Sequence, residues 1–151
     1  MFSRIFNFRM FVMLILGFSS GLPLALVGGT LMSWYAVSGV KMLNIGLLAL
    51  ITQPYFFKFL WAPALDLKLN SKILKTLNLD TRRSWIMLMQ LGLMLGLVCM
   101  AFGNPKINPL LLASIGLIVA ILSATQDVAI DAYRIEILPE AERGLGSAMQ
   151  V

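Results

Sequence analysis

Charged residues are absent from four long stretches of the chain, and apolar side chains fill these stretches. A helix needs about 20 predominantly apolar residues to cross the hydrocarbon core of a bilayer, so each stretch can form a membrane span or most of one. The pattern therefore predicts an all-α membrane protein with four transmembrane helices. We expect them at about residues 10–37, 43–65, 85–103 and 110–138.

Composition narrows the class of protein further. Hydrophobic residues make up 59% of the chain and charged residues only 13%, whereas soluble domains average about 25% charged. The net charge of +5 is spread over short connections, so no nucleic-acid-binding face is predicted. With one cysteine, Cys99, and no histidine, we expect no disulfide framework, metal site or cofactor. No nucleophile or nucleotide-binding motif is present, so an enzyme is not predicted.

The placement of Lys and Arg predicts the orientation of the spans. Short basic loops stay in the cytoplasm, and the connection 66–84 is the most basic part of the chain. We therefore expect this loop and both termini in the cytoplasm, with Lys41 and Lys106 outside. Aromatic residues near span ends are expected at the headgroup level; these are Trp34, Tyr35, Trp61 and Trp85.

Small residues recur at helical spacing in two spans. Gly17, Gly21 and Gly28 share one face of the first span, and Gly92 and Gly96 repeat the pattern in the third. Glycine at this spacing lets helix backbones approach closely, so we expect helix–helix contacts there. Pro23 is expected to bend the first span, because it removes a backbone hydrogen bond.

Charges inside the spans are the strongest functional signal. Lys58 lies in span two, and Asp127 and Asp131 lie one turn apart in span four, where Arg134 shares their face. A charge near the bilayer centre costs at least ~2.5 kcal/mol, so we expect these groups to face the bundle interior or water. Glu136 points nearly the opposite way and is expected at headgroups or solvent.

Three interpretations of these charges stay open. The aspartates could bind coupling protons, because burial disfavours a charged carboxylate. One of them could pair with Lys58, or with Arg134, and lock helices together. They could also simply line a wet cavity. Further polar side chains within the spans are candidates for the same pathway: Ser20, Gln53 and Gln126.

Four sequence blocks resemble the AmpG family of muropeptide permeases, within the major facilitator superfamily. Residues 17–30 (GFSSGLPLALVGGT) are similar to that family's first span, and residues 54–63 (PYFFKFLWAP) to its second. Residues 123–134 (SATQDVAIDAYR) resemble its fourth span, and residues 142–146 (ERGLG) the loop into its fifth. Asp66 with Arg82 and Arg83 has a counterpart in the superfamily's gating loop, although Pro63 and the Lys-rich stretch 68–75 depart from the usual pattern.

The resemblance implies the fold and the function, which the residues alone do not. It implies a partial major-facilitator domain, taken from a twelve-helix protein of two six-helix halves. It also implies import of anhydro-muropeptides across the bacterial inner membrane for peptidoglycan recycling, with protons as the coupling partner. Eukaryotic acetyl-CoA transporters form a related branch, so another solute such as acetyl-CoA is an alternative.

The number of spans bears on whether this chain can transport a solute by itself. Gly144, Gly146, Ser147 and Ala148 are typical of the start of a fifth helix. Transporters of this class bind solute between two pseudo-symmetric halves, so we expect no transport by four spans alone. A truncated piece, a split gene and a decayed reading frame all stay open. A different class of function, a small four-span structural or assembly protein, is the second hypothesis.

Overall fold

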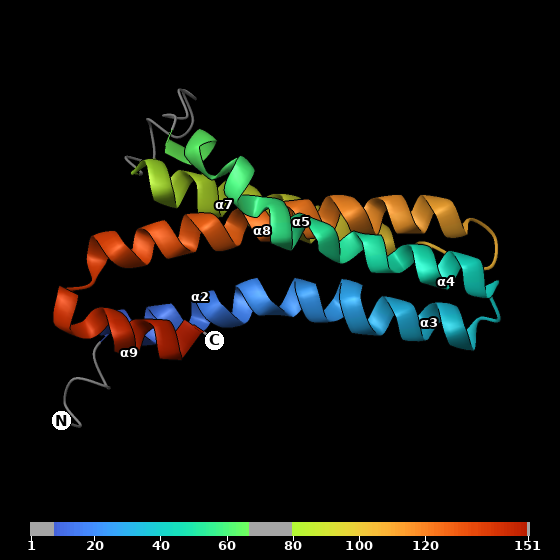
Figure 1. The fold of residues 1–151 in the computed structure, drawn as a ribbon, viewed down its shortest axis with the longest axis horizontal. Helices are drawn as coiled ribbons and strands as arrows, with labels where there is room; N and C mark the ends of the chain where they lie inside the picture. The colour runs from blue at the N-terminus through green and yellow to red at the C-terminus, as the bar shows by residue number, and fades with distance from the viewer. Residues whose placement is uncertain (1–7, 67–79, 151) are drawn as a thin grey trace.

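The computed structural model describes residues 8–66 and 80–150, and all structural statements refer to these residues. Four helical segments in the described part are long and apolar enough to cross a membrane, which confirms the predicted fold class. They lie side by side with their long axes aligned (Figure 1). Their bounds are Phe8–Val37, Met42–Leu60, Thr81–Ala101 and Pro109–Ile137.

The first span consists of α2 (Phe8–Ala25), the π-helical turn η1 (Leu26–Thr30) and α3 (Leu31–Val37). The π turn begins three residues after Pro23, which cannot donate a backbone hydrogen bond to the preceding turn. Gly28 and Gly29 lie within η1 and relax the backbone there. The irregularity expected from Pro23 therefore takes the form of a wider helical turn, a feature often found at functional sites.

The second span, which we expected at about 43–65, is not one regular α-helix. It runs through α4 (Met42–Leu48), η2 (Ala49–Thr52), α5 (Gln53–Phe57), η3 (Lys58–Leu60) and η4 (Ala62–Asp66), where the η segments are 3₁₀ turns. Pro54 and Pro63 explain the breaks, because neither residue has the N–H that would continue an α-helical ladder.

The third and fourth spans, α7 (Thr81–Ala101) and α8 (Pro109–Ile137), form the most extensive helix pair. Glycines permit their close approach. A Cβ built on Gly96 would lie 2.6 Å from Val119 Cγ2, and one on Gly92 would lie 3.1 Å from Leu122 Cδ1. Gly92 and Gly96 therefore lie where α7 and α8 approach each other.

The glycine face of the first span is only partly used. Gly17 is buried, and a Cβ on Gly28 would lie 3.9 Å from Thr52 Cγ2. Gly21 is exposed, and a Cβ added there meets nothing within 4 Å in the described part of the chain. The predicted helix contact at Gly21 is thus wrong for this structure. Gly116 on α8 instead approaches Leu31 and Ile51, a contact that the spacing of glycines did not indicate.

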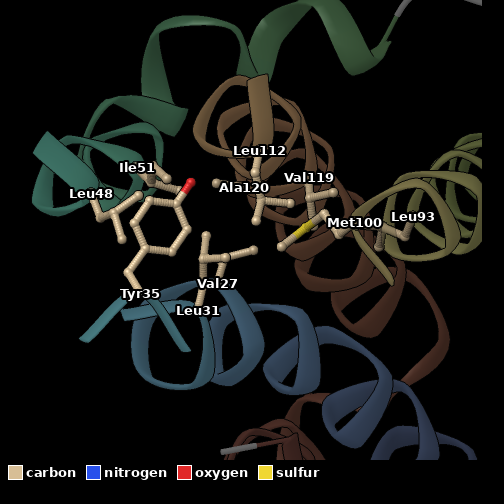
Figure 2. Close-up of a cluster of buried hydrophobic side chains, with 10 residues drawn as sticks. All are labelled: Val27, Leu31, Tyr35, Leu48, Ile51, Leu93, Met100, Leu112, Val119 and Ala120. Atoms are coloured by element: carbon tan, nitrogen blue, oxygen red, sulfur yellow. The ribbon is translucent and has the colours of Figure 1, made fainter. Parts of the chain in front are cut away.

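One apolar cluster joins all four spans (Figure 2). Tyr35 belongs to this cluster: it is fully buried, and its hydroxyl donates a hydrogen bond of 2.5 Å to the Pro109 carbonyl. This position corrects the expectation that Tyr35 lies in a headgroup belt. The other members are Val27, Leu31, Leu48, Ile51, Leu93, Met100, Leu112, Val119 and Ala120.

A short helix, α9 (Glu140–Gln150), turns back from α8 and runs beside the start of α2 (Figure 1). Met10, Met13 and Leu138 form a second apolar cluster at this junction. Arg143 donates to the Ile135 and Leu138 carbonyls and so caps the end of α8. We call this end of the bundle the α9 end. The opposite end, where Gly39 (φ 69°) turns the chain from α3 into α4, is the Gly39 end.

Candidate functional site

An ion pair lies inside the bundle, in the part of the spans nearer the α9 end. Lys58 Nζ at the start of η3 is 3.4 Å from Asp127 Oδ2 on α8, so the expected contact between Lys58 and one of the two aspartates is present. Ser20 on α2 donates a hydrogen bond to the other carboxylate oxygen, Oδ1. Asp127 therefore links three spans through its two oxygens.

The burial of these groups explains why they occur together. The side chains of Lys58 and Asp127 are 33% and 21% exposed, so both are mostly buried between the spans. An isolated charge at this depth would be costly, and each group supplies the opposite charge that the other requires. Ser123 reinforces the arrangement, because its hydroxyl donates to the Ser20 carbonyl at 3.3 Å.

An uncharged polar cluster lies next to the ion pair and joins α2, α7 and α8. Gln126 is fully buried, and its Nε2 donates to Gln90 Oε1 at 2.8 Å and to Ser19 Oγ at 3.2 Å. Ser19 Oγ in turn donates to Gln90 Oε1 at 2.8 Å. Buried polar groups normally have partners. Within the described residues, however, Gln126 Oε1 and the Tyr55 hydroxyl have none.

Span two is held to α8 by a second polar contact. Trp61 Nε1 donates to Thr125 Oγ1 at 3.1 Å, and Thr125 donates to the Ile121 carbonyl at 2.7 Å. The indole therefore contacts a neighbouring helix, which corrects the expectation that Trp61 serves only as a headgroup anchor. Lys58 lies three residues before Trp61, so the two contacts fix the same irregular segment against α8.

Asp131 and Arg134 form a separate pair one turn further along α8. Their side chains approach to 3.2 Å, and Arg134 also donates to Ser147 Oγ on α9 at 3.3 Å. Asp131 is 42% exposed, twice the exposed fraction of Asp127. The two aspartates have similar positions in the sequence pattern, but their neighbours differ. Asp127 faces spans one and two, and Asp131 is linked to α9 through Arg134.

The expected gating residues lie at the α9 end. Arg82 Nε is 3.0 Å from Glu136 Oε1, and Arg82 Nη1 donates to the Leu65 carbonyl at 3.3 Å. Arg83 lies over the Tyr133 ring, 5.6 Å from its centroid, and 3.9 Å from Asp80 Oδ2. Glu136 is half exposed, as its expected place at headgroups or solvent requires, and it also pairs with Arg82. The side chain of Asp66 lies outside the described residues.

Gln53 does not join these polar clusters. It is exposed and lines a groove of about 440 Å³ between span two and α8, whose other walls are apolar. Among the described residues, no group of three or more His, Cys, Asp or Glu side chains could hold a metal ion.

Several site residues were missed by sequence reasoning. They are Ser19, Tyr55, Gln90 and Thr125, which are all uncharged. Gln90 could have been found, since it is the only side-chain amide between Ser84 and Gly103. The pairing of Glu136 with Arg82 could not be found in this way, because it depends on how α7 and α8 pack.

Comparison with known proteins identifies the family. A family model described as acetyl-coenzyme A transporter 1 matches residues 9–151. The chain belongs to this transporter family. It is therefore a membrane protein of a family of transporters, not of enzymes.

Individual relatives confirm the resemblance to AmpG permeases. The chain is 38% identical to the anhydromuropeptide permease of Escherichia coli K12 over 95% of its own length and 28% of that protein. It is also 38% identical to a Rickettsia bellii protein that bears the transporter name AmpG 1, over 89% of this chain and 32% of the relative. These bacterial permeases, together with the apolar helices, make the chain a protein of the bacterial inner membrane. It spans about a third or less of the relatives it matches.

Proposed function

We propose that the chain forms part of a proton-driven importer of anhydro-muropeptides. The name of the Escherichia coli relative supports the class of solute. The observation that carries the proposal is the link from Asp127 to Lys58 and Ser20, which joins three spans through one carboxylate that can bind a proton.

The geometry suggests how a proton would act. A charged Asp127 attracts Lys58 and accepts from Ser20. Protonation removes the charge, so Lys58 is left without its counter-ion and span two loses one of its two polar contacts with α8. Proton binding would thereby change the contacts between α2, span two and α8. Such a change is the kind of two-state rearrangement that alternating access requires.

The uncharged cluster supports a role in binding a polar solute. Gln126 Oε1 can accept a hydrogen bond and the Tyr55 hydroxyl can donate one, and both lie beside the ion pair. A muropeptide offers hydroxyl, amide and carboxylate groups as partners. We assign Gln126 and Tyr55 to solute binding, and Asp127 with Lys58 to coupling.

We propose that the α9 end faces the cytoplasm. Arg82, Arg83, Arg134 and Arg143 lie at that end, whereas the Gly39 end carries Lys41 and Lys106. In a Cys99→Ala background, an impermeant thiol reagent applied from outside should label Lys41→Cys. It should label Asp80→Cys only after the membrane is permeabilised. The reverse pattern would overturn the orientation.

Uptake measurements test the transport proposal. The protein at its natural length would be expressed in cells that lack their own permease, and entry of labelled anhydro-muropeptide would be followed with and without a protonophore. We expect uptake that the protonophore abolishes. Uptake that persists without a proton gradient would refute the coupling.

Acetyl-CoA is a second candidate solute, favoured by the description of the family model. The same cells would be offered labelled acetyl-CoA, and unlabelled acetyl-CoA would be tested as a competitor. Uptake of acetyl-CoA in place of muropeptide would select this alternative. Uptake of neither solute would reject both and leave the structural or assembly role.

A further inference from the structure

The Gly39 end carries a basic pocket, which the transport proposal does not use. It has a volume of about 430 Å³ and lies between the turn from α3 to α4 and the connection from α7 to α8. Lys41 comes from the first connection and Lys106 from the second, and both line the pocket together with Ser38, Asn44 and Pro109. Two lysines far apart in the sequence thus meet at one cavity.

No acidic group balances these lysines. The seven acidic residues of the chain all lie at or between positions 66 and 80 or positions 127 and 142. Along α8, Asp127 is about 27 Å from Pro109, beyond the range of about 10 Å over which charges interact at moderate salt. Among the described residues, neither lysine forms an ion pair.

The helix that begins at the pocket adds to its positive potential. α8 starts at Pro109 and continues for 29 residues, and the Asn108 side chain makes no capping hydrogen bond. The N-terminus of a long helix carries a partial positive charge, and its first N–H groups lack intrahelical acceptors. The pocket therefore combines two lysines, a serine hydroxyl and an asparagine amide, which can all donate to an anion. The start of α8 adds positive potential only, because Pro109 has no N–H to donate.

The walls of the pocket are held in place. The Lys106 N–H donates to Asn104 Oδ1 at 3.0 Å, within the connection from α7 to α8. The Tyr35 hydroxyl donates to the Pro109 carbonyl at the start of α8. Gly39 adopts a positive φ of 69°, which a side chain at this position would strain. These contacts hold the backbone on both sides of the pocket, whereas the two lysine side chains are exposed.

We infer that this pocket binds a phosphate group. Phosphate suits several converging donors and two positive charges. Its place at the end of the spans matches the level of phospholipid headgroups, and a free phosphate would reach the same donors from solution. The inference does not depend on which solute the protein transports.

The experiment compares the two sources of phosphate, with the purified protein at its natural length. In one arm, inorganic phosphate is titrated at constant ionic strength and the melting temperature is followed. In the other arm, the protein is placed in nanodiscs containing phosphatidylglycerol or only phosphatidylcholine, and retained lipid is measured by mass spectrometry. A response in the first arm alone indicates free phosphate, and retention of phosphatidylglycerol alone indicates a headgroup.

Variants test whether the pocket is responsible. Lys41→Gln and Lys106→Gln should each weaken binding about fivefold, and together about 25-fold. The charge-preserving pair Lys41→Arg and Lys106→Arg should retain most of it. A matched control, Lys72→Gln with Lys75→Gln, removes two charges from the basic connection and should leave the response unchanged. Equal binding by the wild type and the Lys41→Gln, Lys106→Gln protein, or no binding in either arm, would overturn the inference.

Discussion

The two halves of α8 are both buried, but by different chemistry. Leu112, Gly116, Val119 and Ala120 pack into the apolar cluster toward the Gly39 end (Figure 2). From Ser123 to Arg134 the same helix carries hydroxyl, amide and charged groups that bond to α2, span two, α7 and α9. One helix thus contains an apolar half and a polar half.

The two halves of α8 are therefore expected to have different roles: the apolar half stabilises the fold, and the polar half can change its contacts. Apolar contacts depend on shape, so the Gly39 half has one good packing arrangement and resists change. Contacts in the polar half depend on charge and proton position, and they can be exchanged for others without opening a void. We therefore expect substitutions in the polar half to affect transport more than stability, and substitutions in the apolar half to do the reverse.

The largest effect is expected from Asp127→Asn. The change preserves shape but removes the charge, so Lys58 is left unpaired inside the bundle. An unpaired Lys58 disturbs the contacts that the proposed rearrangement exchanges, and we expect muropeptide uptake to fall by about 100-fold or more. Uptake would be measured at matched amounts of membrane-inserted protein.

Glu136→Gln is the control for that experiment. Glu136 lies on the same helix and also pairs with a basic residue, Arg82, but it is half exposed. Such pairs are worth about 1 kcal/mol or less, so uptake should fall less than tenfold. Equal losses in the two variants would show that Asp127 has no special role.

The ion pair itself is tested by combining two changes. Lys58→Ala and Asp127→Asn each leave a single group without its partner, whereas the double variant removes both charges. We expect the double defect to be smaller than the sum of the two by about 2 kcal/mol, expressed as the ratio of uptake rates. Additive defects would contradict the pairing and favour proton binding by Asp127 without the help of Lys58.

The sequence predicted the spans well because hydrophobic length is a local property. Charge-free stretches were sufficient to predict the four spans, and the buried charges singled out Lys58 and Asp127. The sequence could not separate Asp127 from Asp131, because the difference lies in their neighbours: spans one and two for Asp127, and α9 for Asp131.

Two predictions, one from helical spacing and one from position in the span, were wrong because both depend on which neighbours lie nearby in space. Gly21 shares a face with Gly17 and Gly28, yet it has no neighbour in the described structure, because the π turn and the direction of span two decide which part of that face is covered. Tyr35 lies near a span end, where a belt position is the general expectation, but a carbonyl within reach lets it be buried.

The apolar half is tested by comparing Gly96→Leu with Gly21→Leu. Both changes give a similar gain in helix propensity, so their difference reports the space available. A Cβ on Gly96 would lie 2.6 Å from Val119 Cγ2, whereas one on Gly21 meets nothing within 4 Å. We expect Gly96→Leu to destabilise the protein by about 2 kcal/mol, measured by thermal unfolding in detergent. Equal destabilisation by Gly21→Leu would reveal a contact at Gly21.

The smallest effect is expected from Tyr35→Phe, which removes one oxygen from the apolar half. The hydroxyl donates a hydrogen bond to Pro109 from a fully buried position, so the change loses one bond while the ring keeps its packing. The loss should be about 1 kcal/mol of unfolding free energy. Uptake should stay near that of the wild type, because the contact lies in the apolar half. A large loss of uptake with unchanged stability would mean that Tyr35 takes part in the rearrangement, and the division of α8 into two halves would fail at this residue.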